Sequence, residues 1–330
     1  MADNFNSRAL TLAVNKMKPV KTPVLDTVFK RKKRSLTGVF AWDLKTATNT
    51  IMKSISTSAE ATVRGGVGKV EVTCNAPRYA EKELISASDI ADMRKFGSVT
   101  ETELLKDRVA EEQADMRSNM DLTREFQAVK ALSGVIVDRD NKQLVDFNFP
   151  ADLKPTLTGT SLWTDGASDP IKNIREWKKL IAVNSGGIIQ EFVAYCGSAA
   201  MDALMSNENV LEKLKFLAGK QIAEEGRIAR LAKVTIEEYD GTYTDQNGTV
   251  HDMIPEDVFV LVGLVQDGAA ELYAPVIDFD APAGAGKGKP ADMFFSKMWD
   301  EKDPSGKWIK VESRPLPVLT RLISVWAKVV

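Results

Sequence analysis

The sequence predicts an α+β fold organised around one long helix, and three observations support this prediction. Residues 98–133 contain neither proline nor glycine and have helix signals at both ends. Stretches rich in β-branched residues, which are typical of strands, precede and follow this interval. Between residues 169 and 265 helical and strand-like patterns are mixed, which is typical of a domain that combines helices with a sheet.

The central helix is predicted over residues 98–134. Ser98 and Thr100 each begin an S/T-x-x-E capping box, which satisfies free N–H groups in a first helical turn. At the other end, Lys130 lies in the last turn and Gly134 supplies the left-handed conformation that ends many helices. At a rise of 1.5 Å per residue, this helix would be roughly 50 Å long.

The apolar residues of this helix form a narrow stripe. Its members are Leu105, Val109, Met116, Met120 and Phe126, and a second, shorter stripe contains Leu104, Leu122 and Val129. The pattern indicates a helix that packs along part of its length and is solvated elsewhere. Arg108 and Glu112 would form an i,i+4 pair, and Asp121 would pair with Arg124 at i,i+3, each contributing about 0.2–0.5 kcal/mol. The helix is either an ordinary long helix or a spine that crosses a broad, thin subunit.

A long two-stranded hairpin is predicted before the helix, over residues 38–79. Residues 63–69 form its glycine-rich turn, and residues 70–75 alternate as the returning strand. A two-stranded hairpin buries too little apolar surface to be stable alone, so it must lie against a second domain or another subunit. Residues 81–96 are then predicted to be a mixed helical segment.

The N-terminal segment is basic. Residues 1–34 contain nine basic and two acidic residues, a net charge of +7, although the whole chain has a net charge of −2. Pro19 and Pro23 prevent one continuous helix. Five consecutive basic residues end the segment: Lys30, Arg31, Lys32, Lys33 and Arg34. This run could contact phosphate backbones or acidic protein surfaces, or it could be a solvated tail.

The chain after the long helix alternates short helices and strands. A second hairpin is predicted from residues 135–138 and 143–149, and residues 154–166 have the composition of a linker or loop. Asp169 and Pro170 begin a helix as N-cap and first residue. The other predicted elements are helices at 198–205 and 210–217 and strands at 188–196, 234–243, 258–265 and 322–330.

Composition excludes several classes of protein. The 330 residues could form two domains or one large one, and their content of 44% apolar and 27% charged residues is ordinary for a globular protein. A net charge of −2 argues against a nucleic-acid or membrane-surface binder by charge alone. No apolar run reaches about 18 residues, and the first residues lack a secretory signal. The distant Cys74 and Cys196 indicate a reducing compartment and two packed free thiols.

No catalytic, cofactor or metal site is predicted. His251 is the only histidine, so a Ser-His-Asp triad or a multi-histidine metal site would depend on this one residue in a polar turn. The Gly-Lys pairs at 68–69, 286–287 and 288–289 each lack the first glycine and the hydroxyl residue of a phosphate-binding loop. We therefore expect no enzymatic activity.

Several stretches, in the same order along the chain, resemble the tailed-phage major capsid proteins, specifically the lambda major head protein (gene E product) family. The densest is the helical stretch at 111–134, which ends in A-L-S-G and leads to V-D-F-N-F at 145–149. G-L-V-Q-D-G at 263–268, Y-A-P at 273–275 and E-S-R-P-L-P-V at 312–318 also resemble the family. The shared order of these stretches carries the resemblance.

This resemblance implies an α+β capsid fold of Hong Kong ninety-seven type. Residues 1–34 would be an N-terminal arm, and residues 35–97 an extended β-hairpin loop with its flanking segment. Residues 98–153 would form a peripheral domain containing the spine helix, and residues 154–307 an axial α/β domain. Residues 308–330 would be a C-terminal strand that returns to the peripheral domain.

The resemblance also implies a structural virion protein without cofactors. Copies would form hexamers and pentamers that close into an icosahedral head around double-stranded DNA, after assembly in the bacterial host cytoplasm. Other expected partners are scaffold, portal and decoration proteins, with non-specific DNA contact and no membrane. The subunit-interface candidates are Arg64, Gly65, Gly66, Gly68 and Lys69, and the basic run at 30–34 supplies the arm contacts.

The residues alone leave two other functions open. One is a cytoplasmic two-domain α/β enzyme with an unrecognised site. The other is a nucleic-acid-binding protein that uses the basic N-terminal segment. The family has no catalytic motif to carry over, which agrees with the motif search and favours the structural function over the enzyme.

Overall fold

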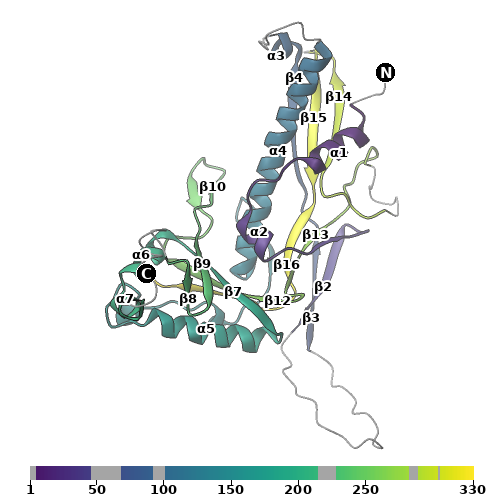
Figure 1. The fold of residues 1–330 in the computed structure, drawn as a ribbon. Helices are drawn as coiled ribbons and strands as arrows, with labels where there is room; N and C mark the ends of the chain where they lie inside the picture. The colour runs from purple at the N-terminus through teal and green to yellow at the C-terminus, as the bar shows by residue number, and fades with distance from the viewer. Residues whose placement is uncertain (1–4, 46–67, 92–100, 215–227, 282–288, 304) are drawn as a thin grey trace, which may run out of the picture. The chain divides into compact units, whose positions relative to one another are not determined.

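The computed structural model describes the chain as two compact units. The described residues are 5–45, 68–91, 101–214, 228–281, 289–303 and 305–330. The first unit comprises Met1–Phe40, Thr73–Phe126 and Glu271–Pro317, and the second comprises Ala41–Val72, Gln127–Ala270 and Val318–Val330. Each unit therefore combines segments that are far apart in the sequence, as the colours of Figure 1 show.

The first unit contains one small sheet, most of a second small sheet and most of the long helix. One sheet has the order β14-β15-β4, with β4 at Tyr79–Ser86, β14 at Phe295–Glu301 and β15 at Gly306–Ser313. The other has the order β1-β13-β16, with β1 at Lys32–Arg34, β13 at Ala269–Tyr273 and β16 at Pro315–Leu319. The helices are α1 (Ser7–Lys16), α2 (Pro23–Thr27), α3 (Ala87–Ala91) and α4 (Glu101–Leu132).

α4 confirms the predicted long helix. It spans Glu101–Leu132, and the caps predicted at Ser98 and Thr100 lie outside the described residues. Gly134 follows the helix with a φ of 90°, and a Cβ on it would lie 2.7 Å from Cγ of Phe149. Because glycine alone avoids both the left-handed strain and this clash, the predicted C-terminal signal is correct.

The core of the first unit lies between α4, α1 and the β14-β15-β4 sheet. Its buried members are Leu10, Val14, Ile85, Leu105, Val109, Met116, Met120, Phe294, Ile309 and Val311. The predicted apolar stripe of α4 is thus confirmed, and Phe126 is buried as well. In the second stripe, Leu122 is 43% exposed, whereas Val129 is buried.

The segment predicted to be helical at residues 81–96 is mostly a strand where the structure describes it. β4 pairs with β15 along its whole length, from Tyr79 opposite Ser313 to Ser86 opposite Gly306. Only Ala87–Ala91 are helical, and residues 92–100 lie outside the described part. The glutamate and lysine content favoured a helix locally, but eight pairings with a strand distant in sequence outweighed that preference.

The N-terminal segment packs onto the first unit, so its interpretation as a solvated tail was wrong. α1 begins at an Asn6 cap, whose Oδ1 accepts a hydrogen bond of 2.8 Å from the N–H of Ala9. α2 begins at Pro23, which agrees with the prediction that the prolines prevent one continuous helix. The buried side chains of this segment include Leu10, Val14, Val24, Leu25 and Phe29.

The base of the predicted hairpin is present. β2 (Val39–Lys45) and β3 (Lys69–Asn75) pair as a two-stranded sheet. Most side chains of β3 are exposed. Residues 46–67, which include most of the predicted glycine-rich tip, lie outside the described residues.

The second unit is built on a five-stranded sheet of order β17-β12-β7-β9-β8. These strands are β7 (Ile189–Cys196), β8 (Arg230–Leu231), β9 (Val234–Glu238), β12 (Val258–Val265) and β17 (Ser324–Lys328). The hairpins β5-β6 and β10-β11 comprise Val135–Val137 with Gln143–Asp146 and Thr242–Thr244 with Val250–Asp252. The helices are α5 (Pro170–Ser185), α6 (Ser198–Ser206) and α7 (Glu208–Leu214), with short 3-10 turns at Ala151–Leu153 and Gly159–Ser161.

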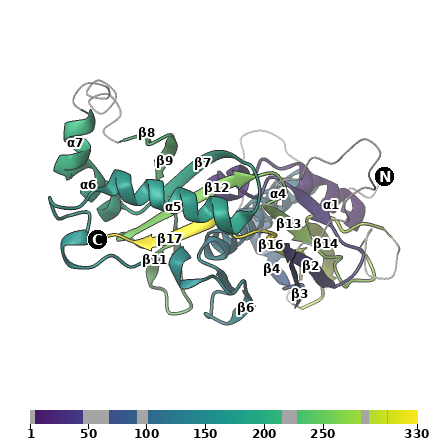
Figure 2. The ribbon, with the colours of Figure 1, turned by 90° about the horizontal axis from the view of Figure 1, so that it is seen from below.

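The core of the second unit is apolar and aromatic. Figure 2 shows α5 crossing the sheet at β12 and β17. Trp163 lies at the centre of this core, 6.0 Å from the Trp177 ring and 5.0 Å from the Phe259 ring, measured between ring centroids. α5 approaches closely at Gly263 of β12, where a Cβ would lie 2.9 Å from Cγ2 of Ile181. As predicted, β12 is buried along most of its length.

The units divide the chain differently from the expected domain boundaries. α4 passes from the first unit to the second after Phe126, and Glu271–Pro317 belongs to the first unit rather than with residues 154–270. The C-terminal segment at 308–330 also divides. β15 pairs with β14 and β4, whereas β17 pairs with β12 in the other unit. Among the described residues, no helix is long and apolar enough to cross a membrane.

Candidate functional site

Only part of the predicted hairpin interface lies in the described part of the chain. Arg64, Gly65 and Gly66 fall outside it, whereas Gly68 and Lys69 lie at the start of β3. Lys69 Nζ forms an ion pair of 2.7 Å with Oδ2 of Asp43 on β2. Both side chains are exposed, so the pair links the two strands at the hairpin base without adding much stability.

The predicted basic run forms the exposed edge strand of a sheet. β1 pairs in parallel with β13, with Lys32 opposite Glu271 and Arg34 opposite Tyr273. The run is fixed at both ends, because the N–H of Glu271 donates to the Arg31 carbonyl at 2.8 Å and the N–H of Ser35 donates to the Tyr273 carbonyl at 2.7 Å. All five basic side chains are exposed. The structure therefore presents a row of positive charge on a rigid backbone.

A buried ionic cluster lies beside β13 in the first unit. Arg124 of α4 donates two hydrogen bonds to the carboxylate of Glu271, from Nε at 2.6 Å and from Nη2 at 2.8 Å. Asp121 accepts from Arg117 at 3.0 Å and from Arg124 at 2.5 Å. All four side chains are buried. We call Arg117, Asp121, Arg124 and Glu271 the buried ionic cluster.

The cluster keeps Arg124 charged. Burial alone would lower the pKa of Arg124, but the hydrogen bonds and the negative charge of Glu271 raise it above its usual value, with help from Asp121. The guanidinium of Arg117 also lies over the Phe294 ring, 3.7 Å from its centroid. The predicted pairing of Asp121 with Arg124 is confirmed. The small contribution expected for it applies to pairs on an isolated helix, whereas this pair is buried.

Polar side chains of α4 also hold the N-terminal segment. Arg117 Nη1 donates to the carbonyl of Val14 at 3.1 Å, and Gln113 Nε2 donates to the carbonyl of Leu10 at 3.3 Å. The Glu125 carboxylate accepts from the first free N–H groups of α2, those of Val24 at 2.8 Å and Leu25 at 3.0 Å. The segment that ends in the basic run is therefore tied to the long helix.

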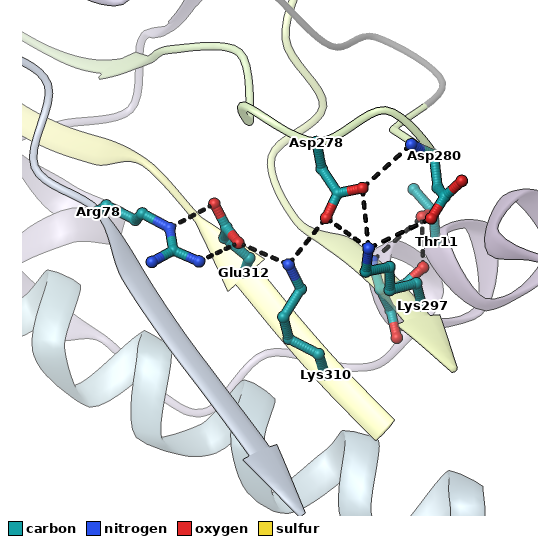
Figure 3. Close-up of polar contacts among 8 residues, drawn as sticks. Thr11, Arg78, Asp278, Asp280, Lys297, Lys310 and Glu312 are labelled. Atoms are coloured by element: carbon teal, nitrogen blue, oxygen red, sulfur yellow. Dashed lines mark hydrogen bonds and ion pairs between the residues drawn. The ribbon is translucent and has the colours of Figure 1, made fainter. Parts of the chain in front are cut away.

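A second charged network fixes a loop on the other face of the β14-β15-β4 sheet (Figure 3). Asp278 in the loop accepts from Lys297 of β14 at 2.8 Å and from Lys310 of β15 at 3.0 Å. Lys310 also bonds to Glu312 at 2.9 Å. Glu312 in turn receives two bonds of 2.9 Å from Arg78. We call this network the loop clamp.

The loop clamp holds Asp278 ionised. Partial burial works to raise the pKa of this carboxyl group, but three hydrogen bonds outweigh it and lower the pKa to about 2. The donors are Lys297, Lys310 and the N–H of Asp280, which lies 3.0 Å from Oδ1. Lys297 also pairs with Asp280 at 3.2 Å. The loop is thereby fixed through its own acidic residues.

Sequence reasoning missed the buried ionic cluster and the loop clamp. One signal was available for each. Glu271 is a charged residue inside the apolar strand sequence A-A-E-L-Y, and Asp278 alternates with apolar residues in V-I-D-F-D. A charge in an apolar segment indicates a buried partner, but the partner's identity depends on contacts between distant parts of the chain.

Cys196 and His251, both in the described part of the chain, are not placed next to each other or next to a partner that would activate them. Burial, with the nearby charge of Glu238, raises the pKa of the Cys196 thiol to about 12, so it stays protonated. His251 is exposed and pairs with Asp245 at 3.1 Å within the β10-β11 hairpin. In the described part of the chain, no group of three or more His, Cys, Asp or Glu side chains could hold a metal ion.

Comparison with solved structures identifies the fold. A structure assigned as a capsid protein of a prophage from Escherichia coli CFT073 has 20% identity and a TM-score of 0.66, covering 98% of this chain and 99% of that chain. The capsid of cyanophage P-SCSP1u has 8% identity and a TM-score of 0.56, covering 94% and 90%. The mature capsid of bacteriophage PhiM1 has 13% identity and a TM-score of 0.53, with the same coverage of 94% and 90%.

These likenesses confirm the predicted α+β fold of phage capsids, and at such low identity they establish the fold alone. A search of curated proteins finds no match. The model of one protein family, described as phage major capsid protein E, matches residues 6–330. Because this match extends over nearly the whole sequence, the chain belongs to the phage major capsid protein E family.

Proposed function

We propose that this chain assembles into hexamers and pentamers that close into an icosahedral head around double-stranded DNA. The observation that carries the proposal is the family match over residues 6–330, together with the capsid fold of both units. Repeated heterologous contacts between copies close rings, and many weak contacts sum to a stable shell. Assembly in the host cytoplasm, with scaffold, portal and decoration proteins, belongs to the same proposal.

The hairpin between β2 and β3 is proposed as one subunit contact, through Arg64, Gly65, Gly66, Gly68 and Lys69. Its base supports this proposal, because β3 exposes most of its side chains and pairs with a single strand. Two strands alone bury too little apolar surface to be stable in water. A neighbouring copy that covers the hairpin would bury the additional apolar surface that the hairpin needs.

The test compares particle formation by the complete chain and by a variant in which a short Gly-Ser linker replaces residues 46–67. We expect the complete chain to give closed shells in negative-stain microscopy. The variant should give folded subunits without shells, with an unchanged unfolding midpoint. Normal shells from the variant would refute the role of the hairpin, whereas no shells from the complete chain would refute the proposed function itself.

The basic run is proposed to contact an acidic partner, either an acidic surface of another head protein or DNA phosphates. Its exposure and its fixed backbone support this role. The test variant carries Lys32→Gln, Lys33→Gln and Arg34→Gln, and the matched control carries Lys172→Gln, Arg175→Gln and Lys179→Gln on the exposed side of α5. We expect a several-fold loss of particle yield or DNA content only in the first variant. Equal yields and DNA contents from both would contradict the proposal.

The proposed function has no enzymatic component. Two observations support this part of the proposal. The described residues include a protonated, buried Cys196 and an exposed His251 that pairs within its own hairpin. Neither is placed as an activated nucleophile or as a general base beside one.

A further inference from the structure

The loop held by the loop clamp points two apolar side chains outward. Ile277 is 71% exposed and Phe279 is 100% exposed, the highest value among large apolar residues in the described part of the chain. Their neighbours alternate with them. Val276 and Ala281 are buried against Phe295, and Asp278 points to the lysines of the sheet in Figure 3. The outward direction of Ile277 and Phe279 thus follows from inward anchors on both sides.

The clamp makes this arrangement rigid. Asp278 is bound by two lysines from neighbouring strands, and the N–H groups of Asp280 and Ala281 donate to Asp278 at 3.0 and 3.2 Å. A loop fixed in this way loses little conformational entropy when a partner binds it. Fixed aromatic side chains of this kind are typical anchors of protein interfaces.

A further exposed apolar side chain lies on the sheet, two residues along β14 from a lysine of the clamp. Lys297 pairs with Asp278 and Asp280, and its Nζ also lies 5.7 Å from the ring centroid of Trp299. Trp299 is 36% exposed and stacks on Trp308 with 6.4 Å between centroids. We call the exposed apolar side chains of Ile277, Phe279 and Trp299 the loop patch.

The charges around the loop patch indicate the kind of partner. The clamp contains three cations and three carboxylates, namely Arg78, Lys297, Lys310, Asp278, Asp280 and Glu312. The groups pair with one another, so the clamp, which forms the rim of the patch at the loop, has no net charge. Nucleic acid binding requires an excess of positive charge, and the carboxylate of Asp280 beside Phe279 would repel phosphates. An apolar centre with a self-neutralised polar rim instead matches a protein surface.

We propose that the loop patch is a contact between two copies of this chain in the assembled shell. This inference rests on the proposed function, because in a shell built from one chain the lateral neighbours of each subunit are further copies. The neutral rim agrees with that occupant, since contact between copies then brings no like charges together. Phe279 is the anchor of the contact, and Ile277 and Trp299 extend it.

Photo-crosslinking in assembled particles identifies the occupant directly. The photoreactive residue p-benzoylphenylalanine replaces Phe279, purified particles are irradiated, and the products are analysed by denaturing gel and mass spectrometry. We expect covalent dimers in which residue 279 is joined to a peptide of this same chain. The same variant, irradiated as dilute unassembled subunits, should give none. Crosslinks to another head protein, or no dimers from particles, would overturn the proposal.

A substitution series measures how much the contact matters. Phe279→Ser should lower particle yield at least ten-fold, while Phe279→Leu should keep most of it. Both variants should keep the unfolding midpoint of the original subunit, because the side chain is fully exposed. Full assembly of Phe279→Ser would refute the contact and leave the proposed function intact. If the unaltered chain formed no particles, the proposed function would fail instead.

Discussion

The two units of this protein bury their helices in different ways. In the second unit, α5 places Ile174, Trp177 and Ile181 in an apolar core with the sheet. In the first unit, α4 adds the buried ionic cluster to an apolar stripe. When atoms are removed from an apolar core, the stability of the protein falls by an amount that grows with the number of atoms removed. A buried charge that is left without its partner is strongly destabilising. The comparison therefore predicts that the units respond differently to small changes.

The largest effect is expected from Glu271→Ala. This change leaves Arg124 buried without its bidentate partner, so we expect a loss of about 3–5 kcal/mol in the free energy of unfolding. Denaturant unfolding of unassembled subunits measures it. A loss below about 1 kcal/mol would show that water or another group compensates Arg124, and that the cluster does not hold the first unit together.

The matched control for Glu271→Ala lies in the second unit. Ile181→Val removes one buried methylene group where α5 approaches Gly263. Since the surrounding side chains are apolar, we expect a loss of only about 0.5–1.5 kcal/mol. A loss as large as that of Glu271→Ala would erase the proposed difference between the units.

A smaller and pH-dependent effect is expected from Asp278→Asn. The pKa of Asp278 is lowered from 3.8 to about 2 in the folded protein, so its ion pairs stabilise the fold above about pH 4. This contribution, about 1–2 kcal/mol, should disappear as the pH falls from 4 toward 2. Unfolding free energies measured from pH 6 to pH 3 should therefore show a difference between the original and the variant that shrinks in acid.

The control for this pH dependence is Asp280→Asn in the same loop. Asp280 has one exposed ion pair with Lys297, whereas Asp278 binds two lysines. We expect Asp280→Asn to keep most of the acid-dependent loss of stability. If Asp278→Asn and Asp280→Asn removed the acid-dependent loss of stability equally, the stabilisation by the clamp would depend on the net charge of the loop rather than on Asp278.

Local signals in the sequence were sufficient for several elements. The C-terminal end of α4 follows from Gly134, and the start of α5 follows from Asp169, whose carboxylate accepts from the Lys172 N–H at 3.1 Å. The continuous apolar run at Val258–Val265 predicted a strand buried on both faces. These features depend on residues within a few positions of one another, so the sequence displays them directly.

The remaining features depend on contacts across the chain. β4 was predicted as a helix because its pairing with β15 is not visible in its own residues. The buried ionic cluster joins Arg124 to Glu271, which is 147 residues away, and the loop clamp joins Arg78 to Glu312. The candidate contacts at 30–34 could be listed from their charge, but their position in an edge strand could not.

Electron cryo-microscopy of particles assembled from this chain is the most direct test of the central claim, that neighbouring copies complete what the single subunit leaves uncovered. The account predicts closed shells of pentamers and hexamers in which residues 46–67 of one copy lie on another copy. Shells in which this segment is covered entirely by its own chain, or particles without subunit rings, would contradict the account.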